Sequence, residues 1–188
     1  VLIGFVLGII LALMRLGHNK LLHGLAVAYI EFIRGTPLMV QVMFVYFGIG
    51  AVIQSLPALA AGIIAVSLNS GAYVAEVIRS GIESIAIGQT EAARSLGMSQ
   101  KQTYQYVVIP QAIKNIWPAL GNEFITLIKE SSIVSVIGVG DLMYQTQLVQ
   151  SATYKGVAPL AITMVIYFVL TFTLSKGLNY FEGKMKHE

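Results

Sequence analysis

The sequence predicts an all-α protein that crosses a membrane about five times. Of its 188 residues, 56% are hydrophobic and only 11% are charged, whereas roughly a quarter of the residues in a soluble domain are charged. The apolar residues gather into runs close to the length of about 20 residues that a helix needs to cross a bilayer. We therefore expect residues 1–188 to form a single transmembrane domain in the cell membrane.

Five apolar runs are the candidate spans, and we take them in chain order. The first is already apolar at its first residue, so we expect this helix to be cut short. Pro57 follows Leu56 directly and predicts a tight hairpin between the second and third spans. The residues between the third and fourth spans are polar and form an extramembrane loop, 80–111. The five runs are residues 1–16, 38–56, 57–78, 113–137 and 157–174.

The basic residues support this number of spans and set their orientation. Cytoplasmic flanks of membrane proteins are enriched in Lys and Arg. With the N-terminus outside, only Lys155 lies on the outer side and Lys129 lies within the fourth span, while the other basic residues flank the inner ends. Loop 80–111 and the C-terminus are then cytoplasmic, and 138–155 is external. The inner residues are Arg15, Lys20, Arg34, Arg79, Arg94, Lys101, Lys114, Lys176, Lys184 and Lys186.

The composition also excludes several classes of chemistry. The chain has no Cys, so it forms no disulfide, iron–sulfur cluster or thiolate zinc site. Its three His residues are not spaced as H-E-x-x-H, and no G-x-x-x-x-G-K-[ST] segment is present to bind a nucleotide. The net charge of +3 follows from the inner flanks and does not indicate nucleic-acid binding. We predict a chain that is not an enzyme and binds no metal or cofactor itself.

The cytoplasmic loop contains the signals for two short helices joined by a bend. Residues 91–96 favour a helix, and Gly97 suits the residue after its end. Ser99 can cap a second helix that begins at Gln100. These signals alone also fit an ordinary solvated connector.

The sequence of this loop resembles a known family. E-A-A at residues 91–93, Gly97 and the ending Val107-Val108-Ile109-Pro110 are similar to the EAA loop of ABC importer permeases, although Val107 and Ile109 stand where that pattern usually has Ile and Leu. Three further segments strengthen the resemblance to permeases for polar and basic amino acids, the histidine, arginine, lysine, glutamine, glutamate and opine type. They are EFIRGTPL at 31–38, NSGAYVAE at 69–76 and KESSIV at 129–134.

The resemblance implies a permease of the type I importer fold that works as part of a complex. The expected partners are a dimer of ATP-binding subunits, a second permease copy or paralogue, and an external solute-binding protein that meets the outer loop. ATP and Mg²⁺ would be bound by the partner ATPase. The residues expected to couple to that ATPase are Glu91, Ala92, Ala93, Arg94, Gly97 and Met98.

Two other functions remain as alternatives at this point. A self-sufficient proton-coupled secondary transporter could use Glu76 or Glu123 as its proton site, but such proteins are built from internal repeats and no motif recurs in this chain. An intramembrane enzyme is disfavoured because the His and Cys sets are missing and the one Asp, Asp141, lies outside the spans.

Polar residues within the third and fourth spans form the candidate substrate site. Ionisable groups inside a membrane usually mark a transport pathway, because they are costly unless paired or hydrated. Asn69, Tyr73 and Glu76 share one helix face, and Glu123, Thr126 and Glu130 share another. The surplus of acidic groups favours arginine, histidine or lysine as the substrate, with glutamine also possible in this family. The full candidate set is Asn69, Ser70, Tyr73, Glu76, Glu123, Thr126, Lys129 and Glu130.

The same residues have a structural alternative. Asn69, Ser70 and Tyr73 could join helices by hydrogen bonds, and Glu76 could pair with Arg79 three residues on. Gly4 and Gly8, spaced as small-xxx-small, and Gly62 are expected to mark close helix approach.

Overall fold

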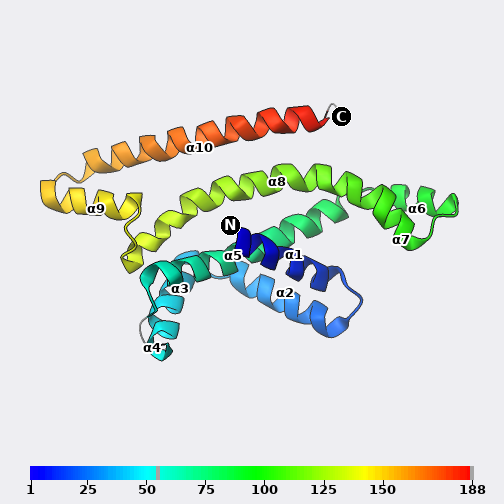
Figure 1. Cartoon of the computed structure of the whole chain (residues 1–188), viewed down its shortest axis with the longest axis horizontal. Helices are drawn as coiled ribbons and strands as arrows, with labels where there is room; N and C mark the ends of the chain where they lie inside the picture. Colours follow the sequence, from blue (N-terminus) through cyan, green and yellow to red (C-terminus); the bar gives the residue numbers. More distant parts are fainter. Residues whose placement is uncertain (54–55, 187–188) are drawn as a thin grey trace.

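The computed structural model describes residues 1–53 and 56–186, and within them the chain is helical with no strand. The long helices α5 (Ala58–Glu83), α8 (Ile109–Glu130) and α10 (Val157–Lys186) run along the long axis of the molecule (Figure 1). Helix α8 packs between α5 and α10. The predicted all-α class is confirmed.

Helix α1 (Leu2–Leu16) lies in close contact with α5, as its glycines predicted. A Cβ placed on Gly4 would lie 2.8 Å from Cβ of Ser70, and one placed on Gly8 would clash with Val74. A Cβ placed on Gly62 of α5 would likewise lie 3.1 Å from Cγ1 of Val134. Backbone approach at small residues therefore sets the spacing of these helices.

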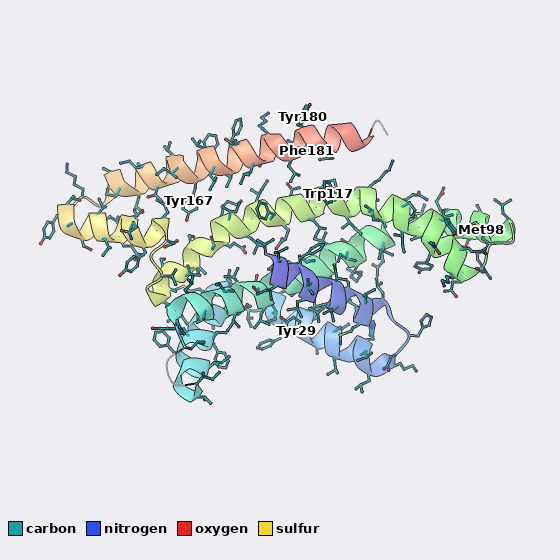
Figure 2. All side chains as sticks on the ribbon, in the orientation of Figure 1. Tyr29, Met98, Trp117, Tyr167, Tyr180 and Phe181 are labelled. Atoms are coloured by element: carbon teal, nitrogen blue, oxygen red, sulfur yellow. The ribbon has the colours of Figure 1, made fainter. Side chains whose placement is uncertain are left out.

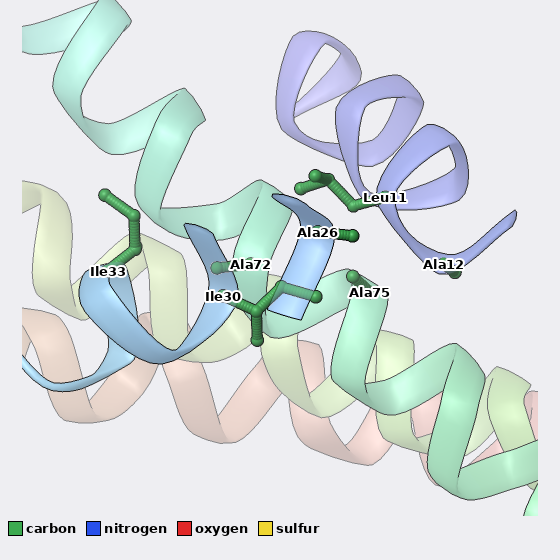
Figure 3. Packing of buried hydrophobic residues seen from close by; sticks show 7 residues of the cluster. All are labelled: Leu11, Ala12, Ala26, Ile30, Ile33, Ala72 and Ala75. Carbon is green, nitrogen blue, oxygen red and sulfur yellow. The ribbon is translucent and has the colours of Figure 1, made fainter. Parts of the chain in front are cut away.

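The main core lies where α1 and α2 (Lys20–Arg34) meet α5. Leu11 of α1 and Ile30 of α2 fill the space that small residues such as Ala72 leave on α5 (Figure 3). A second buried cluster joins α3 (Leu38–Met43) to α5 around Val42 and Ala65. The α1–α2 pair and α3 are thus both fixed to α5.

The second predicted span is more complex than expected. Helix α2, capped by the Asn19 side chain, was not predicted, and it bends by 104° into the helical stretch Leu38–Val52. That stretch comprises α3, a π-helical turn, η1 (Phe44–Ile49), and α4 (Gly50–Val52). The predicted end of the span includes residues 54 and 55, which lie outside the described residues.

Within the described residues, α5 and α10 are each long and apolar enough to cross a bilayer alone. The bent pair Lys20–Arg34 and Leu38–Val52 supplies a third crossing if both parts belong to one span. The count of five spans stays a prediction.

The fourth and fifth spans are both longer than predicted. Helix α8 starts at Ile109 and continues as a 3-10 helix, η3 (Ser131–Ile137), which ends at Gly138 with a φ of 83°. Residues 138–155, predicted as a loop, contain a helix that was not predicted, α9 (Leu142–Thr153). Asp141 caps this helix by accepting a hydrogen bond from the Tyr144 amide at 2.8 Å.

Candidate functional site

Loop 80–111 contains the two short helices and the bend that its sequence predicted, but its bounds differ: residues 80–83 belong to α5, residues 109–111 belong to α8, and the first short helix starts at Ile87 and not at Glu91. Helix α6 (Ile87–Ser95) is followed by Gly97, whose φ of 85° is in the left-handed region that favours glycine. Helix α7 (Gln100–Thr103) begins with a capping box in which the Ser99 amide donates to Gln102 Oε1 at 2.8 Å and the Gln102 amide donates to Ser99 Oγ at 3.3 Å. The two helices stand at the end of the molecule opposite α9 (Figure 1).

The candidate coupling residues lie on α6 and in the bend after it. Arg94 donates from Nη1 to the Met98 carbonyl at 2.7 Å, which closes the bend. Ala93 is buried, whereas Glu91, Ala92 and Arg94 are exposed. Met98, labelled in Figure 2, lies at the tip of the element. Leu96 beside it is 85% exposed, so the tip presents apolar surface as well as charge.

Helix α7 continues into α8. The π-helical segment η2 (Tyr104–Val108) follows α7 directly and leads into α8, where Pro110 falls in the first turn. Because helical residues precede Pro110 without a break, this proline lies inside the helical path, just after the π-helical turn, and has no amide to donate there. The sequence predicts the loop and the fourth span as separate elements, but residues 100–130 form one uninterrupted helical path.

The polar face of α5 contacts α2 and α3 in the same chain. Asn69 is 3% exposed and donates from Nδ2 to Gln41 Oε1 at 3.0 Å. The Tyr73 ring lies beneath the Arg34 guanidinium, whose Cζ is 5.5 Å from the ring centroid. Ser70 is buried against α1 at Gly4.

Gln41 connects this face to the bend between α2 and α3. Its Nε2 is within hydrogen-bond distance of the Ile33 carbonyl (2.7 Å), the Thr36 carbonyl (3.1 Å) and Thr36 Oγ1 (2.9 Å). The bend leaves carbonyls at the end of α2 without partners in the helix, and an amide side chain can satisfy them. One side chain therefore ties the broken helix to α5.

Glu76 is the centre of a charged cluster in the C-terminal half of α5. Its Oε2 accepts a hydrogen bond from Arg15 Nη1 at 2.8 Å, and its Oε1 accepts from Arg79. Arg34 Nη1 is 3.6 Å from Oε2, and Arg79 also pairs with Glu83. The predicted pair with Arg79 is present, and two further arginines join α1 and α2 to the same carboxylate.

The polar residues of α8 make fewer contacts within the chain than those of α5. Glu123 and Thr126 are half-buried, whereas Lys129 and Glu130 are exposed. Within the part of the chain that the structure describes, Glu123, Lys129 and Glu130 form no ion pair.

The two polar faces lie at the same level of the molecule. Helix α5 is in close contact with α8 where Ile116 lies against Gly81, and with η3 where Val134 lies against Gly62. Residues 69–76 lie between those two glycines on α5, and residues 123–130 of α8 lie between Ile116 and Val134 along the chain. No hydrogen bond joins the two faces among the described residues. The structure thus places both predicted faces on neighbouring helices without linking them.

Sequence analysis did not select Arg15, Arg34 and Gln41 as site residues. Gln41 is a lone amide in an apolar run, a signal that could have drawn attention to it. Arg15 and Arg34 were taken only as flanking charges. Their convergence on Glu76 depends on how α1 and α2 pack, which helical periodicity does not encode.

The known proteins that are similar to this chain are permeases of one family. Residues 4–187 match the family described as binding-protein-dependent transport system inner membrane component. The arginine transport system permease protein ArtQ of Bacillus subtilis is 43% identical over 98% of this chain and 85% of its own length. The probable glutamine ABC transporter permease protein GlnM of the same organism is 42% identical, over 97% of this chain and 84% of its own length.

Solved structures show the same fold. A crystal structure of an amino acid ABC transporter with histidines has a TM-score of 0.92 and 51% identity, covering 97% of this chain and 86% of that one. An inward-facing structure of the methionine ABC transporter MetNI has a TM-score of 0.74 at 20% identity, over 97% of this chain and 88% of that chain, and supports the fold alone. The chain therefore belongs to the inner membrane components of binding-protein-dependent transport systems, as a permease subunit of the amino-acid ABC importers.

Proposed function

We propose that this chain forms, with a second permease copy or a paralogue, the membrane pathway of an ATP-driven importer for polar amino acids. Two ATP-binding subunits on the cytoplasmic side would bind ATP and Mg²⁺ and hydrolyse the nucleotide. An external solute-binding protein would deliver the substrate at the end where α9 lies. The chain itself carries out no chemical step.

The unbroken helix from α7 through η2 into α8 is the observation that carries the coupling part of this proposal. A partner that moves α6 and α7 moves α8 with them, because no flexible residue separates α7 from α8. Rigid elements transmit displacement across an interface more directly than loops do. Glu91, Ala92, Ala93, Arg94, Gly97 and Met98 are proposed to contact the ATP-binding subunit.

For the substrate we propose a basic amino acid, namely arginine, histidine or lysine, with glutamine as the second candidate. Glu123 and Glu130 outnumber Lys129 on the α8 face, and an ammonium or guanidinium group would compensate that charge. Relatives named for arginine and for glutamine are about equally similar to this chain, so the relatives alone do not separate the two.

The proposed pathway residues fall into two groups, according to whether they also join helices of this chain. Tyr73, Glu123, Thr126, Lys129 and Glu130 keep polar groups that can face a substrate. Asn69, Ser70 and Glu76 are proposed to border the pathway while also joining helices, because Asn69 and Glu76 have partners on α1–α3 and Ser70 is packed against α1.

The family membership favours ATP over a proton gradient as the energy source, and a reconstituted complex tests this. The permease would be co-purified with its ATP-binding subunit in nanodiscs and mixed with the loaded binding protein. We expect arginine, histidine or lysine to stimulate ATP hydrolysis more than glutamine or glutamate does.

A charge reversal on α6 tests the coupling contacts in the same assay. Glu91→Lys should abolish the stimulation, because it reverses an exposed charge on the proposed contact surface. Gln89→Lys adds a positive charge about 200° around α6 from Glu91 and serves as the control. Equal loss in both variants, or stimulation that survives Glu91→Lys, would refute the coupling assignment.

A further inference from the structure

Three arginines converge on one carboxylate in the cluster around Glu76. Arg15 bonds Oε2 at 2.8 Å, and Arg79 bonds Oε1 from both Nε and Nη2. Each carboxylate oxygen therefore already has a charged donor. Arg34 is the farthest of the three from the carboxylate, because its Nη1 lies 3.6 Å from Glu76 Oε2, which is beyond hydrogen-bond distance.

The Arg34 guanidinium is held in place without its donors being used. It makes no hydrogen bond to the described part of the chain, although guanidinium carries five N–H donors. The Tyr73 ring lies 5.5 Å from Cζ and supports the guanidinium by a cation–π contact. The Arg34 side chain is 37% exposed, compared with 16% for Arg15 and 24% for Arg79. Arg34 is thus the arginine of this cluster that can reach a ligand.

Charge and position both favour an anionic ligand. Three arginines face two carboxylates, Glu76 and Glu83, so one positive charge in the cluster is left without a counter-charge. Arg34 ends α2 at the bend, and its guanidinium lies over Tyr73, which is on the polar face of α5 between Asn69 and Glu76. A single carboxylate bound there would balance the cluster.

We infer that Arg34 binds the α-carboxylate of the amino acid that this permease transports. The inference rests on the proposed function and adds to it the residue that binds the α-carboxylate, a group that all α-amino acids share. Guanidinium and carboxylate can form two parallel hydrogen bonds, which fix the orientation of the ligand as well as its charge. The side chain of the substrate would then be selected elsewhere, by the carboxylates of α8.

A comparison of ligands with and without the carboxylate charge tests this directly. Binding of labelled L-arginine and of L-argininamide would be measured by equilibrium dialysis on the whole transporter in nanodiscs, without the binding protein. The same pair would be repeated with L-glutamine and L-glutaminamide. We expect the wild type to prefer the acid over the amide by about tenfold or more. Arg34→Gln should lose this preference, and Arg34→Lys should keep part of it.

Arg15→Gln is the matched control, because it removes the same charge from the same cluster without touching the exposed arginine. It should retain the preference for the acid. Equal binding of acid and amide by the wild type, no detectable binding of either, or loss of the preference in Arg15→Gln as complete as in Arg34→Gln would each overturn the assignment.

Two further readouts distinguish a lipid ligand from the substrate and test transport separately. Vesicles rich in anionic phospholipid would be added as a competitor. If they abolish the difference in binding of the acid between the wild type and Arg34→Gln, the site binds a lipid phosphate and the inference is refuted. The stimulation of wild-type ATP hydrolysis by loaded binding protein tests the proposed function independently. A positive result there would support the transport function even if Arg34 does not bind the carboxylate.

Discussion

Replacing Glu76 by Gln removes the charge on which α1, α2 and α5 converge. The Glu76 side chain is 18% exposed, and Arg15 and Arg34 of the other two helices have no second acidic partner among the described residues. Removal of one partner from a largely buried pair leaves the opposite charges uncompensated. Glu83 offers a matched control, because it is 54% exposed and pairs with Arg79 alone.

The size of the effect follows from this difference in burial. Breaking a buried pair costs about 3–5 kcal/mol, whereas an exposed pair contributes about 0–1 kcal/mol. Glu76 is slightly accessible, so we expect about 3 kcal/mol for Glu76→Gln and less than about 1 kcal/mol for Glu83→Gln. For a chain of this size each kcal/mol lowers the thermal midpoint by about 2–4 °C.

The assay is thermal inactivation of the purified complex in detergent, followed by gel filtration of the material that remains soluble. All variants are heated at one rate, because such midpoints depend on scan rate. We expect the midpoint to fall by about 6–12 °C for Glu76→Gln and by less than about 4 °C for Glu83→Gln. Equal shifts in the two variants would refute the argument that the carboxylate of Glu76 joins three helices.

Three further predictions concern the bends and the helix contacts. Gly97→Val should reduce ATP hydrolysis stimulated by the binding protein, because a β-branched residue at a φ of 85° costs about 1–2 kcal/mol; Gly97→Asn should retain most of it, and an equal loss would contradict a role for the left-handed backbone. Gly81→Ala should lower the yield of folded permease on gel filtration, since a Cβ there clashes with Ile116; Ile116→Ala in the same chain should restore it. Gln41→Leu should lower the thermal midpoint, because it leaves the bend and Asn69 without their hydrogen bonds; an unchanged midpoint would show that water replaces the amide.

Local signals in the sequence predicted the parts of the fold that depend on neighbouring residues. The bend at Gly97 and the Ser99 cap appear where the residue types placed them, and the helix predicted at 91–96 is present but runs from Ile87 to Ser95. The long apolar runs became α5 and α10 because continuous hydrophobicity is sufficient to identify such helices. The glycines of α1 indicated close packing for the same local reason.

Helix α2 was missed because its stability depends on packing. The segment carries Lys20, Glu31 and Arg34, so its average hydrophobicity is too low for a span. Ile30 and Ala26 are nevertheless fully buried against α1 and α5. Contacts made by a narrow apolar face stabilise the helix, and the sequence does not say which helices will cover that face.

The sequence predicted which residues belong to the candidate site better than it predicted the contacts between them. The pair between Glu76 and Arg79 follows from a spacing of three residues. Arg15 is 61 positions away from Glu76 in the chain, and no periodicity relates the two. Long-range pairs of this kind depend on how the helices cross, so they could be found only in the folded structure.

Uptake of labelled L-arginine into proteoliposomes tests the central claim most directly. The vesicles would contain the full transporter, with the binding protein outside, and either ATP enclosed or an imposed proton gradient without ATP. We predict uptake only with enclosed ATP, together with its loss in Glu91→Lys. Uptake driven by the proton gradient in the absence of ATP and of the ATP-binding subunit would contradict the account and assign energy coupling to the carboxylates within the membrane.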